Sequence, residues 1–230
     1  MDHGYASIPL HYERRSAEDM LARAHAFSAH MALRRSVRHF SPEPIPIDVV
    51  RACIATACTA PSGANKQPYT FCLVTDPGIK RAIREAAERE EFENYHGRMP
   101  HEWVRELKPL GTDHHKPHLE EAPALVAIFR KSWEPDAEGM RARNYYVAES
   151  TGIAVGMLIA ALHHAGLCCL THTPAPMDFV GRILGRPEHE KAYLLLPVGF
   201  PAEGCQVPDI QRKNMDELLL EFPPNSAKLR

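Results

Sequence analysis

Hydrophobic and polar positions repeat along this chain with two periods, one typical of helices and one typical of strands. Apolar residues three and four positions apart predict helices over residues 16–33, 48–59, 78–91, 144–165 and 176–184. Short apolar runs predict strands over residues 69–75, 124–130, 167–171 and 193–200. Helices and strands mix without regular βαβ repetition. No repeat or low-complexity linker divides residues 1–230, so we expect a single domain.

Two segments differ from this regular pattern. Residues 90–118 hold many charges, three prolines and few long apolar runs. They are predicted to form a mobile surface excursion, and segments of this kind often act as active-site lids. The tail over residues 208–230 is amphipathic only at 218–222, which favours a C-terminal arm that wraps a neighbouring subunit.

Composition and charge narrow the class of protein. The chain is 44% hydrophobic and 24% charged, which is ordinary for a soluble globule, and its size allows a core that needs no disulfide. A formal net charge of -2 gives no support for a nucleic-acid partner. The N-terminus shows no secretory signal, and the apolar stretch Ile153 to Leu162 is shorter than the ~20 residues that span a bilayer. A cytoplasmic location without membrane association is therefore expected, with the six cysteines as small buried hydrophobes.

The run Arg34-Arg-Ser-Val-Arg38 carries the most informative chemistry. Three arginines and a serine within five residues suit a dianionic phosphate, because each guanidinium group can donate two parallel hydrogen bonds to phosphate oxygens. The later turn Ala60-Pro-Ser-Gly-Ala64 suits close approach of the backbone to a flat ring. Local chemistry alone also allows a solvated basic turn and an ordinary helix stop. Together the two motifs suggest a site for flavin mononucleotide (FMN).

These segments resemble the FMN-binding segments of the nitroreductase superfamily, and within it those of the iodotyrosine deiodinase family. The resemblance runs from about residue 30 to 215. It implies an α+β fold with a nitroreductase-like mixed sheet flanked by helices, and an interlocked homodimer with FMN at the interface. The segments that carry it, besides Arg34–Arg38, begin at Thr59, Glu91, Met99, Thr171, Leu184, Leu195 and Pro208.

The resemblance also implies roles for single residues. The cofactor-binding residues would be Arg34, Arg35, Ser36, Val37, Arg38, Pro61, Ser62, Gly63, Thr171, His172, Thr173 and Arg212. Of these, residues 61–63 would approach the flavin from the partner subunit. Thr173 is the expected catalytic residue, because its hydroxyl would hydrogen-bond the flavin N5 atom and favour one-electron steps over hydride transfer. His172 stands where this family usually has Thr, which leaves open a changed pH response of the flavin or a backbone-only role.

A substrate clamp is implied in the lid. Glu91, Tyr95 and Lys116 match the three polar lid residues of the iodotyrosine deiodinases. An amino-acid zwitterion needs an acceptor for its ammonium and a donor for its carboxylate, which Glu91 and Lys116 would supply. Tyr95 would add a hydroxyl and an aromatic wall, and the Ala64 N–H would contact the phenolate oxygen. Composition alone favours a charged solvent-facing helix with an unrelated lysine. No metal site is expected, because the histidines around Lys116 lack a cysteine partner and helical spacing.

The sequence therefore predicts FMN-dependent reductive dehalogenation of halogenated tyrosines, iodotyrosine to tyrosine plus iodide, by one-electron steps. An FMN-dependent NAD(P)H nitroreductase or a quinone/ene reductase would share the cofactor site without needing a lid that binds a zwitterion. A non-catalytic flavin-binding protein and a flavin-fragmenting enzyme are further alternatives, and neither needs an amino-acid clamp. The expected partners are a halotyrosine-like substrate, a second copy of the chain, and a reductant that is either NAD(P)H or a reductase.

Overall fold

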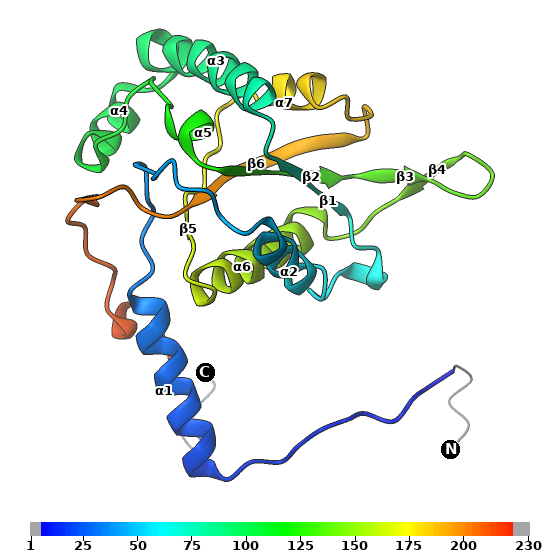
Figure 1. The fold of residues 1–230 in the computed structure, drawn as a ribbon. Helices are drawn as coiled ribbons and strands as arrows, with labels where there is room; N and C mark the ends of the chain where they lie inside the picture. Colours follow the sequence, from blue (N-terminus) through cyan, green and yellow to red (C-terminus); the bar gives the residue numbers. More distant parts are fainter. Residues whose placement is uncertain (1–5, 223–230) are drawn as a thin grey trace, which may run out of the picture.

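The computed structural model describes residues 6–222 and is built around a four-stranded sheet with helices on both faces (Figure 1). All paired strands are antiparallel, and a parallel bridge between Ser36 and Cys169 makes the sheet mixed at its edge. The strands, in sheet order, are β1 (Tyr69–Val74), β2 (Ala124–Lys131), β6 (Glu190–Gly199) and β5 (Cys168–Cys169). The predicted α+β architecture is confirmed.

The first six residues of strand β2 are all apolar and buried because both faces of the strand are covered. One face packs against α2 (Ile47–Ala57) and α6 (Val147–His164), and the other packs against α3 (Pro77–Glu93) and α7 (Asp178–Ile183). Successive side chains of β2 and β6 point to opposite faces of the sheet and pack in one core or the other. A strand buried on both faces loses the alternation of polar and apolar residues, which is why residues 124–129 form a continuous apolar run.

Helix α1 (Ala17–Ala32) stands away from the body of the protomer (Figure 1). Ser16 caps this helix, since its hydroxyl accepts the Asp19 N–H over 3.1 Å. None of the helix residues is buried, and its apolar side chains at Met20 and Phe27 are more than half exposed. The helix prediction is confirmed, whereas residues 6–222 do not bury the apolar stripe of this helix.

The expected excursion at residues 90–118 is largely helical. It consists of the end of α3, the turns η2 (Asn94–Arg98) and η3 (Lys108–Leu110), and α4 (His101–Leu107), and it leads into α5 (His118–Glu121). Helical turns satisfy the backbone groups that an irregular loop would leave to solvent.

The remaining elements lie outside the two cores. A hairpin, β3 (Trp133–Pro135) with β4 (Arg141–Arg143), projects from the end of β2 (Figure 1). The helical turn η1 (Gly63–Asn65) follows α2. The helical turn η4 (Met215–Glu217) lies in the C-terminal arm. The last part of the predicted arm, residues 223–230, lies outside the described residues.

Helix α6 lies within the predicted helix over residues 144–165. Its 18 residues are long and apolar enough, by length and composition alone, to cross a membrane. In the protomer α6 packs on α2 and on the sheet, with Ala154, Val155, Leu158 and Leu162 among its buried residues. The packing of α6 in the core accounts for this composition.

Candidate active site

An extended segment follows the end of α1 and lies beside β5. The Ser36 bridge to Cys169 holds it in place, and the Val37 N–H donates to the Cys169 carbonyl over 3.3 Å. Side chains alternate in an extended chain, so Val37 turns into an apolar cluster while Arg34, Ser36 and Arg38 turn the other way. The segment thus presents two guanidinium groups and a hydroxyl on one face.

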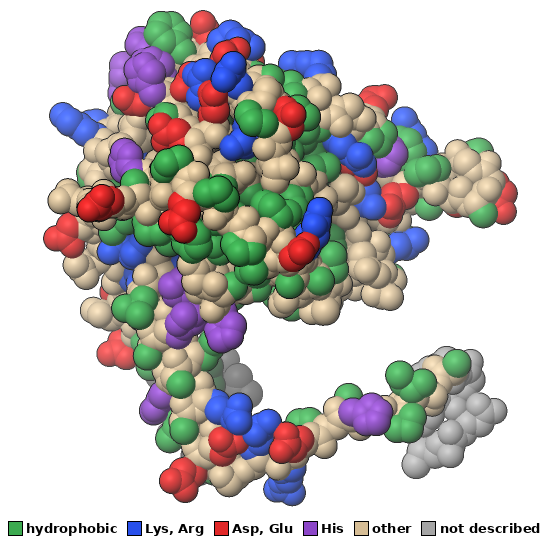
Figure 2. Space-filling model, in the orientation of Figure 1, with side chains coloured by type: hydrophobic (Ala, Val, Ile, Leu, Met, Phe, Trp, Pro, Cys, Tyr) green, Lys and Arg blue, Asp and Glu red, His purple; other side chains and the backbone are tan. Residues whose placement is uncertain are grey.

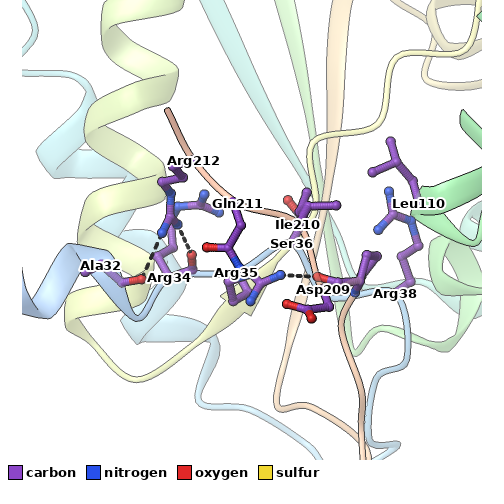
Figure 3. A pocket seen from close by; sticks show the side chains of 11 residues that line it. Ala32, Arg34, Arg35, Ser36, Arg38, Leu110, Asp209, Ile210, Gln211 and Arg212 are labelled. Atoms are coloured by element: carbon purple, nitrogen blue, oxygen red, sulfur yellow. Dashed lines mark hydrogen bonds between the residues drawn. The ribbon is translucent and has the colours of Figure 1, made fainter. Parts of the chain in front are cut away.

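These side chains open onto a cavity of about 440 Å³, within the size range of small-molecule sites. Figure 3 shows that the extended segment, the lid and the C-terminal arm all contribute to it. Its lining residues are Ala32, Arg34, Arg35, Ser36, Arg38, Leu110, Pro208, Asp209, Ile210, Gln211 and Arg212. Five of the twelve residues predicted to bind the cofactor line this cavity, namely Arg34, Arg35, Ser36, Arg38 and Arg212. The other seven do not line it: Val37, Pro61, Ser62, Gly63, Thr171, His172 and Thr173. The sequence analysis predicted Arg212 of the arm but missed Leu110 of the lid and residues 208–211, because nothing in their local pattern places them beside the arginines.

The four arginines of the cavity divide into two that hold the chain and two that face the open space. Arg212 donates to the Arg34 carbonyl over 2.7 Å, and Arg35 donates to the Pro208 carbonyl. These bonds fasten the C-terminal arm to the extended segment. Within residues 6–222, the guanidinium groups of Arg34 and Arg38 make no side-chain hydrogen bond or salt bridge.

An anionic group such as the phosphate of FMN fits this donor set. Arg38 is half-buried, and loss of solvent lowers the pKa of its guanidinium, an effect that Tyr95 partly opposes. A desolvated cation without a carboxylate partner favours an incoming anion. The lining also includes the carboxylate of Asp209, but four arginines outnumber it.

The predicted turn at residues 60–64 forms at the opposite end of the protomer (Figure 1). Gly63 packs so tightly that a Cβ there would lie 2.6 Å from Cδ2 of Tyr146. Ala64 adopts a left-handed backbone with φ 50°, which is uncommon for a residue other than glycine. The next two N–H groups close the turn, whereas the Ala64 N–H has no acceptor among the residues described.

A single protomer therefore does not bring the two predicted flavin-binding segments together. In Figure 1 the turn over residues 60–64, which follows α2, and the extended segment over residues 34–38, which follows α1, lie on opposite sides of the protomer. The assignment of Pro61, Ser62, Gly63 and Ala64 to the site of a partner subunit remains a prediction.

The end of strand β5 places Thr171 and Thr173 on one side and His172 on the other. His172 donates its N–H to the Leu195 carbonyl over 2.9 Å and accepts the Leu195 N–H over 2.8 Å. Thr171 and Thr173 are exposed, while His172 is buried. Desolvation lowers the pKa of His172 well below its ordinary value, and the charges of Lys116 and Arg38 act in the same direction. His172 therefore lies within reach of the charges of both Arg38 and Lys116.

The three predicted lid residues come together in the structure. Glu91 lies near the end of α3, Tyr95 lies in η2, and Lys116 precedes α5. The Lys116 Nζ lies 3.7 Å from Oε2 of Glu91 and 5.4 Å from the centre of the Tyr95 ring. The Lys116 Nζ also donates to the Thr112 hydroxyl over 3.1 Å and to the Asp113 carbonyl.

This lid cluster is buried rather than solvent-facing. The side chains of Lys116 and Glu91 are only 4% and 8% exposed. Desolvation raises the pKa of Glu91 and lowers the pKa of Lys116, and the attraction between the two charges opposes both shifts. A buried ion pair of this kind separates only if each charge finds a new partner.

Two supporting contacts were not foreseen from the sequence. Glu88, one turn before Glu91 on α3, accepts the Lys116 N–H over 2.8 Å and so fixes the base of the lid. His118, two residues after Lys116, packs against His172. The sequence does show Glu88 at helical spacing from Glu91, whereas the contact between His118 and His172 depends on tertiary structure.

The fold and this set of residues define a class of protein. A model of the nitroreductase family matches residues 31–200, and the chain belongs to that family. Its relatives are iodotyrosine deiodinases: one from Haliscomenobacter hydrossis is 52% identical over 94% of this chain and 98% of its own length. The human iodotyrosine deiodinase 1 is 42% identical over 93% of this chain and 74% of its own length.

Solved structures agree with this placement. A crystal structure of oxidized iodotyrosine deiodinase bound to FMN and 3-iodo-L-tyrosine matches with a TM-score of 0.74 and 27% identity, covering 86% of this chain and 98% of that one. The FMN-dependent nitroreductase NfnB from Mycobacterium smegmatis, solved with NADPH, matches with a TM-score of 0.64 at 21% identity. The second likeness shows the fold alone.

Proposed function

We propose that this protein is an FMN-dependent reductive dehalogenase that converts halogenated tyrosines to tyrosine and halide. The observation that carries the proposal is the buried Lys116–Glu91 pair beside Tyr95, close to a cavity rich in arginine. A nitroreductase that accepts flat aromatic substrates has no need for two opposite charges in its lid. An amino-acid substrate needs both.

The cofactor site is proposed at the arginine cavity. Arg34, Ser36 and Arg38 would bind the phosphate of FMN, and Arg212 and Arg35 would hold the arm that closes the cavity. When bound and reduced, FMN supplies the electrons for the reaction and a flat ring on which an aromatic substrate stacks.

The lid pair would recognise the amino-acid end of the substrate. The substrate ammonium replaces Lys116 as the partner of Glu91, and the substrate carboxylate replaces Glu91 as the partner of Lys116. This exchange keeps both buried charges paired, so it avoids the cost of an isolated buried ion. Closure of the lid over the substrate would also exclude water from the reacting ring.

The phenol end of the substrate would be held by a second copy of the chain. The Ala64 N–H lacks an acceptor among residues 6–222 and would donate to the phenolate oxygen. Pro61, Ser62 and Gly63 would contact the flavin from the same side. We therefore propose that the working unit is a homodimer with its sites at the interface.

Thr173 is proposed to tune the reaction toward one-electron steps. Its side chain is exposed at the end of β5, on the opposite side from His172. A hydroxyl donor at the flavin N5 position would support one-electron transfer. In a Thr173→Ala variant, the one-electron-reduced form of bound FMN should no longer accumulate during reductive titration in the presence of a halotyrosine analogue. Nitroarene reduction should rise in the same variant, and a Thr173→Ser variant should keep the original behaviour.

The direct test is an anaerobic titration of the reduced, FMN-loaded protein with 3-iodotyrosine. We expect flavin reoxidation and release of one iodide per flavin oxidised. Reoxidation by a nitroarene without any response to 3-iodotyrosine would instead favour a nitroreductase. Purified protein that stays colourless after incubation with FMN would reject the flavin site itself.

A further inference from the structure

Two buried histidines face each other beneath the lid. His118 on α5 is 4% exposed and His172 at the end of β5 is 9% exposed. Their ring centroids lie 5.3 Å apart, with the rings nearly perpendicular. The Nε2 atom of each ring is buried and has no hydrogen-bond partner within the described part of the chain.

The pair connects the two halves of the proposed site. His118 follows Lys116 by two residues at the base of the lid, and α5 is fastened to α3 by Lys80, whose Nζ donates to two carbonyls of the α5 region. His172 is fixed in the sheet by its two hydrogen bonds with Leu195. A side chain on this face of the strand lies directly behind Thr173 on the other face.

The surroundings of the pair keep both rings uncharged. Arg38 and Lys116 act on both histidines, and His39 acts on His118. The nearby carboxylate on α3, Glu91, is held by Lys116. Burial and these cations lower the pKa of His118 to about 3, and they lower the pKa of His172 in the same direction.

A neutral imidazole carries one N–H donor and one bare acceptor nitrogen. The two unpartnered Nε2 atoms of these neighbouring rings can therefore satisfy each other if one is protonated and the other is not. The contact is made directly after a small rotation of a ring, or through a single buried water that bonds to both. Buried polar atoms left without any partner are rare because they reduce stability.

We propose that His118 and His172 form a neutral hydrogen-bonded pair that positions Lys116 of the lid relative to Thr173 at the flavin edge. Both are positioning residues, since neither touches the substrate in this arrangement. The link to substrate binding rests on the proposed function. The existence of the pair does not.

The first experiment is a double-variant cycle in the FMN-loaded protein. His118→Leu and His172→Leu should each weaken binding of 3-iodotyrosine by about tenfold, which corresponds to ~1.4 kcal/mol. The double Leu variant should bind no more weakly than the poorer single variant, because the remaining partner is no longer left unsatisfied. His118→Gln and His172→Gln keep a donor and an acceptor and should stay within threefold of the wild type.

His115→Leu is the matched control. It removes a histidine next to Lys116 that is exposed and contacts only Asp113 in its hydrogen bonding. Its binding of 3-iodotyrosine should equal that of the wild type. Additive losses in the double Leu variant, or Leu variants that bind normally, would overturn the proposal.

A second measurement separates this proposal from the proposed function. ¹⁵N NMR of histidine-labelled protein should show both rings neutral between pH 8 and pH 5. Urea unfolding should show the same non-additivity between the two Leu substitutions as ligand binding. If the wild type binds no halotyrosine but passes both tests, the pair stands and the proposed function fails. A ring that titrates near its ordinary pKa, or additive unfolding effects, would reject the pair.

Discussion

At the scale of single residues, the arginine cavity makes a direct prediction about FMN. Arg34 and Arg38 face the cavity without a partner among residues 6–222, so each is available for phosphate. Hydrogen bonds to charged groups contribute about 1.5–3 kcal/mol. Arg38→Ala should therefore weaken FMN binding by roughly 10- to 100-fold, measured by equilibrium dialysis. Arg51→Ala, at an exposed arginine paired with Asp48 on α2, is the matched control and should leave FMN affinity unchanged. Equal affinities in both variants would contradict the assignment.

The lid pair makes a prediction that separates stability from binding. Removing one partner of a buried ion pair leaves an uncompensated charge, which costs about 3–5 kcal/mol. Glu91→Leu should lower the free energy of unfolding by an amount of this order, measured by urea denaturation. Glu91→Leu combined with Lys116→Leu should recover most of that stability, because no buried charge remains.

Binding of 3-iodotyrosine should respond differently to the same substitutions. Both the single and the double variant should lose it, since each lacks a partner for one end of the zwitterion. Fluorescence quenching of bound FMN provides the measurement. A double variant that binds 3-iodotyrosine like the wild type would show that the lid does not bind the amino-acid group of the substrate.

His118 makes a prediction about pH. Folding lowers the pKa of His118 from its ordinary value of 6.5 to about 3. As pH falls, His118 therefore takes up a proton in the unfolded chain before it does so in the folded chain. The stability due to the neutral ring is therefore complete above pH 6.5 and is lost progressively toward pH 3. At pH 5 the loss is about 2 kcal/mol, from 1.36 kcal/mol per pH unit.

The comparison with His118→Gln isolates this effect from the carboxylates that also titrate. Between pH 8 and pH 5, the free energy of unfolding of the wild type should fall by about 2 kcal/mol more than that of the variant. Urea denaturation at the two pH values measures the difference. Parallel pH dependence in the two proteins would mean that His118 is accessible to protons in the folded state.

At the scale of elements, the sequence predicted the regular parts of the fold because their patterns are local. The predicted helices over residues 16–33 and 78–91 and the apolar strand β2 follow from short-range rules, and all three are confirmed. The hairpin of β3 and β4 was missed because its strands have only three residues each. Strands this short leave little periodicity to detect.

The lid shows where local pattern stops being informative. Its charges and prolines indicated an irregular surface segment, and composition alone placed Glu91 and Lys116 in solvent. The structure buries both, because Glu88 and the Thr112–Asp113 turn hold Lys116 from other points of the lid. The left-handed Ala64 is a similar case, since nothing in an alanine signals a positive φ. Family resemblance identified these residues, whereas their burial and geometry depend on tertiary contacts.

At the scale of the whole molecule, the protomer leaves surfaces that indicate a second chain. Figure 2 shows apolar side chains along the projecting α1, which makes only a small contact with α6 in the protomer. The apolar residues of the described arm, at Leu218, Leu220 and Phe222, are also mostly exposed. Exposed apolar surface of this extent marks an interaction site. The two proposed halves of the flavin site lie at opposite ends of one protomer, so a partner chain would complete both at once.

In the proposed homodimer, assembly would be coupled to cofactor binding. We expect the wild type to have a mass in solution of twice its 25.8 kDa chain mass, measured by sedimentation equilibrium. Met20→Glu with Phe27→Glu places charges in the apolar stripe and should shift the protein toward a monomer, because buried charges oppose association. If residues 61–64 of the partner contact the flavin, this monomer should also bind FMN more weakly. Ala22→Glu, on the other side of α1, is the control and should remain dimeric. A monomeric variant that binds FMN with wild-type affinity would show that each chain holds a complete cofactor site by itself.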